Sequence, residues 1–159
     1  MQHAGPRRVI IQRNPTSGTG RKRGELLGLV RRLRVHGYSP RLFSSRDRLD
    51  RYLSNPEHRT EVFCVVAAGG DGTVADVVNR CHGLPVAILA LGTENLIARY
   101  LNLPRDGAAV ADMIAAGHRR RLDTWSLNGR RFLIMAGFGF DAEVVRRTSE
   151  QRRGNISKW

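Results

Sequence analysis

The feature that most constrains the fold is an apolar run at residues 62–68 that leads into the turn Gly-Gly-Asp-Gly-Thr at 69–73. The run is rich in β-branched residues and does not alternate between apolar and polar positions, which is typical of a central parallel strand buried on both faces. The residues from the turn to Asn79 favour a helix, with Thr73 as its expected N-cap. The chain is therefore predicted to pass from a buried strand through a tight turn into a helix.

The chemistry of this turn points to phosphate. Glycines let the main chain approach a polyphosphate closely, and the amides at a helix N-terminus donate hydrogen bonds to it. An aspartate in such a turn would repel phosphate unless a metal ion or a proton mediates the contact, so Asp71 is expected to act through Mg²⁺ or a hydroxyl group. The alternative is a strand-to-helix turn in which Asp71 hydrogen-bonds to its own backbone.

Two further turns follow apolar runs in the same way. The run at 8–12 precedes Asn-Pro-Thr-Ser-Gly at 14–18, and the run at 85–91 precedes Gly-Thr-Glu-Asn at 92–95, at the head of a helix expected to reach Leu101. Each turn alone is compatible with ordinary loop chemistry. Three of them after strands of one parallel sheet would converge at its carboxyl edge, where open α/β sheets bind ligands.

Four motifs occur in one order along the chain: Asn-Pro-x-Ser-Gly at 14–18, Gly-Gly-Asp-Gly-Thr at 69–73 with Asp-Val-Val-Asn at 76–79, Gly-Thr-x-Asn at 92–95 with Ala-Arg at 98–99, and Gly-Phe-Gly-Phe-Asp-Ala-Glu-Val at 137–144. With them the sequence resembles the catalytic domain of diacylglycerol kinases and related bacterial lipid kinases, a pattern shared by sphingosine and ceramide kinases. NAD kinases and phosphofructokinases are more distant relatives through the Gly-Gly-Asp-Gly element. The resemblance extends over nearly the whole chain.

The resemblance implies an α/β fold, a three-layer sandwich with a parallel sheet of the NAD kinase and diacylglycerol kinase type. It also implies that residues 1–118 form the nucleotide-binding domain and that residues 119–159 begin a β-rich, lipid-binding second domain that is truncated here. Extended runs at 121–127 and 130–135 around Asn-Gly predict a hairpin at the start of that domain. Without the rest of its sheet, this hairpin is expected to expose Trp125, Phe132 and Phe138.

The activity implied by the resemblance is transfer of the γ-phosphate of MgATP to a lipid hydroxyl, such as that of diacylglycerol. Asp71 is the expected catalytic residue and the candidate magnesium ligand, and the family's general base is expected beyond Trp159. Ser44 is expected either to reach the nucleotide or to be an ordinary loop residue. The implied nucleotide-binding residues are Asn14, Thr16, Ser17, Gly18, Ser44, Gly69, Gly70, Asp71, Gly72, Thr73, Gly92, Thr93 and Asn95.

The sequence departs from the family at two places, since the family usually has Glu at the position of Asp76 and often Asp at that of Leu96. No P-loop sequence and no protein-kinase motif set occurs, which excludes those two kinase classes. Two alternatives remain open: a NAD-kinase-type enzyme that phosphorylates a soluble nucleotide, and a truncated nucleotide-binding module without turnover. The Gly-Thr-x-Asn motif favours the lipid kinase.

Among the other elements, a helix at 22–36 is expected to bury Leu26, Leu27, Val30 and Leu33, and to end at Gly37. Further predictions are a strand at 40–44 and helices at 46–53 and 107–116.

The charge is strongly positive, at +13 from 27 basic and 14 acidic residues, and nearly all the cations are arginine. Arginine binds phosphate in bidentate fashion, and each cation near an anionic leaflet contributes about 1 kcal/mol. The clusters at 118–121, 130–131, 146–147 and 152–153 therefore predict peripheral contact with a membrane that holds the lipid substrate, with a solvated arginine-rich surface as the alternative.

No specific nucleic acid is expected, because no recognition module accompanies the charge. Self-association into a homo-oligomer is a further candidate.

The location is expected to be cytoplasmic, extending to a peripheral position at the inner membrane face. The chain has no run of 18 apolar residues and no signal-peptide core at its start. Its cysteines, Cys64 and Cys81, lack the spacing of a zinc site or a disulfide scaffold. The five histidines follow no metal-ligand spacing.

Overall fold

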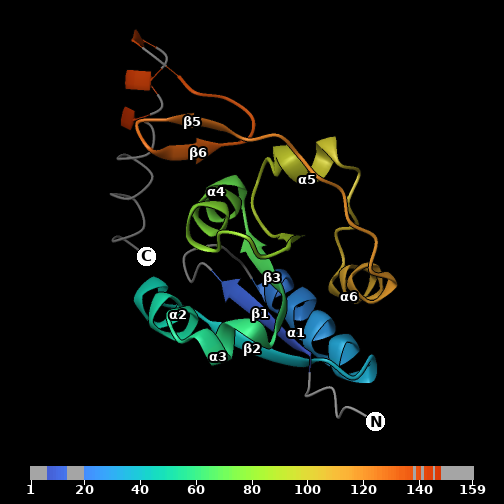
Figure 1. The fold of residues 1–159 in the computed structure, drawn as a ribbon. Coiled ribbons are helices and arrows are strands. Elements are labelled where there is room, and N and C mark those ends of the chain that lie inside the picture. The colour runs from blue at the N-terminus through green and yellow to red at the C-terminus, as the bar shows by residue number, and fades with distance from the viewer. Residues whose placement is uncertain (1–6, 14–19, 138, 141, 145, 148–159) are drawn as a thin grey trace.

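A computed structural model describes residues 7–13, 20–137, 139–140, 142–144 and 146–147 of the 159-residue chain. Its centre is a four-stranded parallel sheet with the strand order β2-β1-β3-β4 (Figure 1). The strands are β1 (Arg8–Arg13), β2 (Ser39–Phe43), β3 (Val62–Gly69) and β4 (Val86–Ala90). All four carboxyl ends therefore lie at one edge of the sheet, and the predicted α/β class is confirmed.

Helices cover both faces of this sheet (Figure 1). They are α1 (Gly20–Val35), α2 (Arg46–Leu53), α3 (Pro56–Thr60), α4 (Asp71–Arg80), α5 (Leu96–Tyr100) and α6 (Gly107–Ala116). On one face, Val9 and Ile11 of β1 pack with α1 and α6. On the other face, Ile10 packs with α2, α4 and α5. Because both faces are covered, successive residues of the strand are buried, which explains the absence of alternation in the sequence.

The buried face of α1 differs from the predicted one. Leu29 is fully buried, whereas Leu27 is 47% exposed. The buried stripe is formed by Leu26, Leu29 and Leu33, the side of α1 that packs against α6. Leu27 lies about 100° around the helix from Leu26, and that rotation turns it away from α6. Gly37 ends α1 with φ +77°, as predicted.

One helix was not predicted from the sequence. The short helix α3 has Asn55 as its N-cap, with the side chain accepting a hydrogen bond from the amide of Glu57, and Pro56 in its first turn. Asn-Pro is a helix-start signal. A five-residue helix is too short, however, to show an apolar periodicity.

The predicted hairpin is confirmed, with shorter strands: β5 (Trp125–Leu127) pairs antiparallel with β6 (Arg130–Phe132). Asn128 and Gly129 both have positive φ, at 49° and 73°, as a type I′ turn requires. Trp125 is 68% exposed and Phe132 is half-buried, whereas Phe138 lies outside the described residues. In Figure 1 the hairpin lies beside α4, away from α1 and α6. None of the described helices is long and apolar enough to cross a membrane.

Candidate functional site

The candidate site begins where β3 passes into α4. The helix starts at Asp71 with Gly70 as its N-cap, so the prediction of Thr73 as N-cap was wrong. Gly70 offers no side chain to the first amides of α4, whereas Ser45, Asn55 and Asp106 each cap their own helix with a side-chain oxygen. The first turn of α4 therefore presents amides that its own N-cap residue does not satisfy.

Thr73 has a packing role instead of the predicted capping role. Its side chain is buried against Gly69, where an added Cβ would lie 2.2 Å from Thr73 Oγ1. Its amide donates a hydrogen bond to the carbonyl oxygen of Gly70 at 2.9 Å. The absence of a side chain at Gly69 is thus required by the turn itself.

The second and third turns touch through their backbones. A Cβ on Gly92 would lie 2.5 Å from the Cα of Gly70, and a Cβ on Gly70 would lie 3.2 Å from the Cα of Gly92. The amide of Leu91 also donates to the carbonyl oxygen of Gly69 at 2.9 Å. The lack of side chains at Gly70 and Gly92 therefore allows the turns after β3 and β4 to come into direct backbone contact.

Asn95 closes the third turn. Its Oδ1 accepts a hydrogen bond from the Gly92 amide at 2.9 Å, and its Nδ2 donates to the Gly92 carbonyl oxygen at 2.8 Å. Asn95 has φ 51°, a left-handed conformation that asparagine tolerates better than most residues. Thr93, by contrast, is exposed beside the closed turn.

Asp71 connects the two turns a second time. Its Oδ1 accepts a hydrogen bond from the amide of Ile97 at 3.3 Å, in the first turn of α5. The carboxylate thus caps the neighbouring helix, which differs from the expected alternative of a bond to its own backbone. Among the described residues, no partner is recorded for its other oxygen, Oδ2.

Among the glycines of these turns, Gly72 is the one whose lack of a side chain is not required by a contact within the protein. Outside its chain neighbours and the backbone of its own helix, no heavy atom lies within 4 Å of the position that its Cβ would occupy, and its φ is not positive. It is exposed at the start of α4. Packing explains Gly69, Gly70 and Gly92, whereas a side chain at Gly72 would meet open space at the start of α4.

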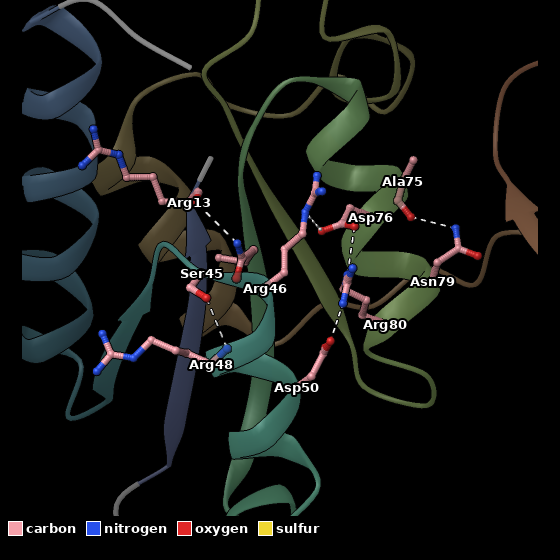
Figure 2. Close-up of polar contacts among 10 residues, drawn as sticks. Arg13, Ser45, Arg46, Arg48, Asp50, Ala75, Asp76, Asn79 and Arg80 are labelled. Atoms are coloured by element: carbon pink, nitrogen blue, oxygen red, sulfur yellow. Dashed lines mark hydrogen bonds and ion pairs between the residues drawn. The ribbon is translucent and has the colours of Figure 1, made fainter. Parts of the chain in front are cut away.

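Further site candidates lie at the ends of the other strands. Ser44 directly follows β2 and is exposed, while its neighbour Ser45 caps α2 by accepting a hydrogen bond from the Arg48 amide at 3.4 Å (Figure 2). The predicted residues of the first turn, Asn14, Thr16, Ser17 and Gly18, lie outside the described residues.

Sequence reasoning missed Gln12, at the carboxyl end of β1. Its side chain is only 4% exposed, and its Oε1 has no hydrogen-bond partner among the described residues. A buried, unpaired amide oxygen is costly, so it calls for a partner. The available signal was a polar residue directly after the apolar run at 9–11. In the sheet, Gln12 lies beside Ala67 of β3.

Asp76 anchors α4 from one flank. Its carboxylate pairs with Arg46 Nε at 3.1 Å and Arg80 Nε at 2.9 Å, and Arg80 also pairs with Asp50 of α2 (Figure 2). The hydrogen bond that Arg80 donates to Asp76 raises the pKa of Arg80 above its usual value. The shorter acid found here in place of Glu therefore still ties α4 to α2.

No group of three or more His, Cys, Asp or Glu side chains is placed to hold a metal ion within the part of the chain that the structure describes.

Comparison with known proteins gives a consistent result. Residues 8–127 match the family described as Diacylglycerol kinase catalytic domain. The chain is 32% identical over 155 residues to a protein named Diacylglycerol kinase from Staphylococcus aureus (strain MRSA252), covering 94% of this chain and 49% of that protein. The protein of the same name from strain JH9 gives the same values.

Among solved structures, the chain superposes on the crystal structure of a diacylglycerol kinase from Bacillus anthracis str. Sterne with a TM-score of 0.63 and 26% sequence identity. The match covers 79% of this chain and 45% of that one. The chain spans about half the length of the curated relatives it matches.

Proposed function

Because the chain belongs to the family of the diacylglycerol kinase catalytic domain, we propose that it binds MgATP at the joined turns 69–73 and 92–95. The whole protein then transfers the γ-phosphate to a lipid hydroxyl such as that of diacylglycerol. The observation that carries this proposal is the open space at Gly72, at the start of a helix whose N-cap residue offers no side-chain hydrogen bond to its first amides.

The phosphates of the nucleotide would be held mainly by the backbone. The amides of Asp71 and Gly72 open α4, where the helix dipole favours negative charge. The contact between Gly70 and Gly92 brings the turn at 92–95 alongside, so that Thr93 can complete the wall of the site. Of the first turn, we keep Asn14, Thr16, Ser17 and Gly18 as proposed phosphate neighbours.

Magnesium fits the chemistry of this site. Mg²⁺ commonly binds one or two carboxylates together with substrate phosphates and waters. Asp71 would offer Oδ2 while Oδ1 remains bonded to the Ile97 amide. When bound, the ion would neutralise charge on the phosphates, and Asp71 would be the residue that fixes its place.

The acceptor is proposed from the relatives' printed name, Diacylglycerol kinase, and from the charge of the chain. One arginine cluster, at 118–121, precedes the β5–β6 hairpin and another, at 130–131, lies within β6, so a membrane surface that contains the lipid is the proposed partner. We also retain the division into a nucleotide-binding domain at 1–118 and the start of a lipid-binding domain at 119–159 as a proposal.

A labelled-phosphate assay tests the reaction. The protein at its natural length would be incubated with radioactive ATP, Mg²⁺ and vesicles that contain diacylglycerol, and the lipids would then be separated by thin-layer chromatography. We expect label in a phosphorylated diacylglycerol. Parallel reactions with ceramide, sphingosine and NAD as acceptors decide the substrate class. Label in NAD alone would contradict the lipid-kinase proposal.

A further inference from the structure

Helix α4 is held on two flanks, and the second flank involves the β5–β6 hairpin. We propose that Asn79 is a positioning residue that clamps this hairpin to α4, so that the hairpin responds to a ligand bound at the head of the helix. The clamp stands on the geometry alone, whereas the response to a ligand rests on the nucleotide site proposed above.

The side-chain amide of Asn79 recognises the backbone of Arg131. Nδ2 donates a hydrogen bond to the Arg131 carbonyl oxygen at 2.9 Å, and Oδ1 accepts one from the Arg131 amide at 2.8 Å. The two residues are 52 positions apart in the sequence. Nδ2 also donates to the carbonyl oxygen of Ala75, one turn earlier in α4, at 2.8 Å (Figure 2).

These three bonds fix the orientation of the amide. Both hydrogens of Nδ2 point to carbonyl oxygens, and Oδ1 meets an N–H group. A flipped amide would place Oδ1 against two carbonyl oxygens and Nδ2 against a donor. Asparagine is therefore matched to this position, because aspartate lacks the donors and glutamine has a longer side chain.

The hairpin register explains why Arg131 is the residue that is clamped. In a two-residue hairpin the pair that flanks the turn, here Leu127 and Arg130, exchanges hydrogen bonds across the strands. The next pair, Ser126 and Arg131, does not, so the N–H and C=O of Arg131 face away from β5. Asn79 satisfies both of these edge groups, as one residue of a third strand would.

The clamp is connected to the phosphate turn through a helix that is tied on its other side as well. Asn79 lies eight residues after Asp71, which is roughly 12 Å along the helix axis. Asp76 binds the opposite neighbour, α2, through Arg46 and through Arg80. A displacement of the head of α4 is therefore passed along one stiff element to the hairpin.

The clamp itself is tested by amide hydrogen exchange, measured by NMR without nucleotide. Alanine at 79 keeps α4 helical because its helix propensity is high. We expect Asn79→Ala to speed exchange of the Arg131 amide at least about tenfold, the scale of one lost hydrogen bond. The matched control is Arg131→Ala, which removes the contact from Arg131 to His82 Nδ1 but keeps both backbone groups. In this control variant, the amide of residue 131 should stay protected from exchange. Equal protection in wild type and Asn79→Ala, or equal loss in both variants, would overturn the clamp.

The response to ligand is tested by the fluorescence of Trp125, which pairs with Phe132 in the hairpin. All proteins would carry Trp159→Phe, so that Trp125 is the one tryptophan observed. MgATP should change its emission in the parent chain. In Asn79→Ala, calorimetry should show MgATP affinity within about threefold of the parent, with the emission change lost.

The outcomes separate the two proposals. If calorimetry shows no MgATP binding to the parent chain, the proposed nucleotide site fails, and the exchange experiment still decides the clamp. If MgATP binds and Trp125 does not respond in the parent, or responds equally in Asn79→Ala, the coupling is overturned.

Discussion

At the residue scale, the four glycines of the two joined turns differ in whether contacts within the protein require them. Gly69, Gly70 and Gly92 are required by contacts within the protein, and Gly72 is not. The sequence alone could mark all four, because glycine-rich turns after buried strands have a known chemistry. It could not distinguish them, since the contact between Gly70 and Gly92 joins distant positions and the contact of Gly69 with Thr73 depends on how the turn folds. The sequence likewise could not pair Asn79 with Arg131, which lies 52 positions away.

Asp71 caps α5, and we propose that its charge also serves the reaction; a pair of substitutions can separate these two roles. Asp71→Asn keeps an oxygen for the Ile97 amide and removes the charge. We expect the fold to survive and turnover of the natural-length kinase to fall at least about 10²-fold, the scale of one preorganised electrostatic group. Asp71→Ala should in addition destabilise the chain by about 1 kcal/mol, the usual cost of a lost cap.

Thermal unfolding and the labelled-phosphate assay measure both effects. If Asp71→Asn keeps activity within about threefold of wild type, the charge of Asp71 has no catalytic role. If Asp71→Ala unfolds at the wild-type temperature, the cap on α5 contributes nothing to stability.

The two cysteines should be unreactive in the folded protein. Burial raises the pKa of Cys64 to about 12 and that of Cys81 to about 11, from an ordinary value of 9.0. The thiolate is the reactive species, so alkylation at pH 8 should be at least about 100-fold slower in native protein than in urea. Mass spectrometry of iodoacetamide-treated protein reads this out for each cysteine. Comparable rates in the two states would show that the thiols are accessible.

The same shifts predict the pH dependence of stability. Folding raises the pKa of these thiols, so the folded state holds their protons more tightly than the unfolded state does. Their contribution is intact below pH 9, where both states are protonated, and it is lost as pH rises from about 9 toward 12. Urea unfolding at pH 8 and pH 10.5 should give a lower midpoint at the higher pH. In the double variant Cys64→Ala with Cys81→Ala, the difference between the two midpoints should shrink.

At the element scale, apolar runs predicted β1, β3 and β4, because buried parallel strands have a composition that other elements seldom share. Prediction failed where tertiary packing decides. The packing of α6 selected Leu29 of α1 for burial and left Leu27 exposed. The short helix α3 is set by its caps and carries no periodic pattern.

The contact between α1 and α6 provides a stability test with a built-in control. A Cβ on Gly107, at the start of α6, would lie 1.8 Å from the carbonyl oxygen of Glu25 and 2.7 Å from the amide nitrogen of Leu29. Gly107→Ala should therefore cost about 1–3 kcal/mol, as overpacking does. At Gly28, in the same interface, the nearest atom would be 3.7 Å away.

Gly28→Ala should be neutral or stabilising by up to about 1 kcal/mol, since alanine favours helix more than glycine does. Urea unfolding of the two variants measures the difference. Equal stability of Gly107→Ala and Gly28→Ala would show that the two helices do not pack as closely as described.

At the scale of the whole molecule, charge and apolar exposure gather in the second half of the chain. Trp125, Met135 and Phe140 are 68%, 69% and 82% exposed, and the arginine clusters at 118–121 and 130–131 lie in the same part of the sequence. The sequence predicted the charge and the exposure of Trp125, because charge runs and a hairpin signal are local, but it did not predict the exposure of Met135 and Phe140. It could not predict how the hairpin is seated on α4, which depends on the contact between Asn79 and the backbone of Arg131.

From this arrangement we propose contact with an anionic membrane surface. We expect the protein to sediment with phosphatidylglycerol vesicles at about 0.1 M salt, and to be released near 1 M salt, where the Debye length falls to about 3 Å. The exposed pair Arg120 and Arg121, changed to alanine, should weaken binding by about 1 kcal/mol per charge. The matched control changes Arg31 and Arg34, which are exposed on α1. Equal binding to neutral phosphatidylcholine vesicles, or equal effects of the two pairs, would contradict a charge-directed surface.

The most direct test of the nucleotide site is a calorimetric titration of the chain with MgATP, comparing wild type with Gly72→Val. Gly72 stands in open space, so valine should leave the melting temperature unchanged or slightly higher. Its branched side chain would fill the space before the α4 amides and block close approach of phosphate. The account predicts weak but measurable MgATP binding to wild type and none to Gly72→Val. Equal affinity of the two proteins for MgATP would contradict it.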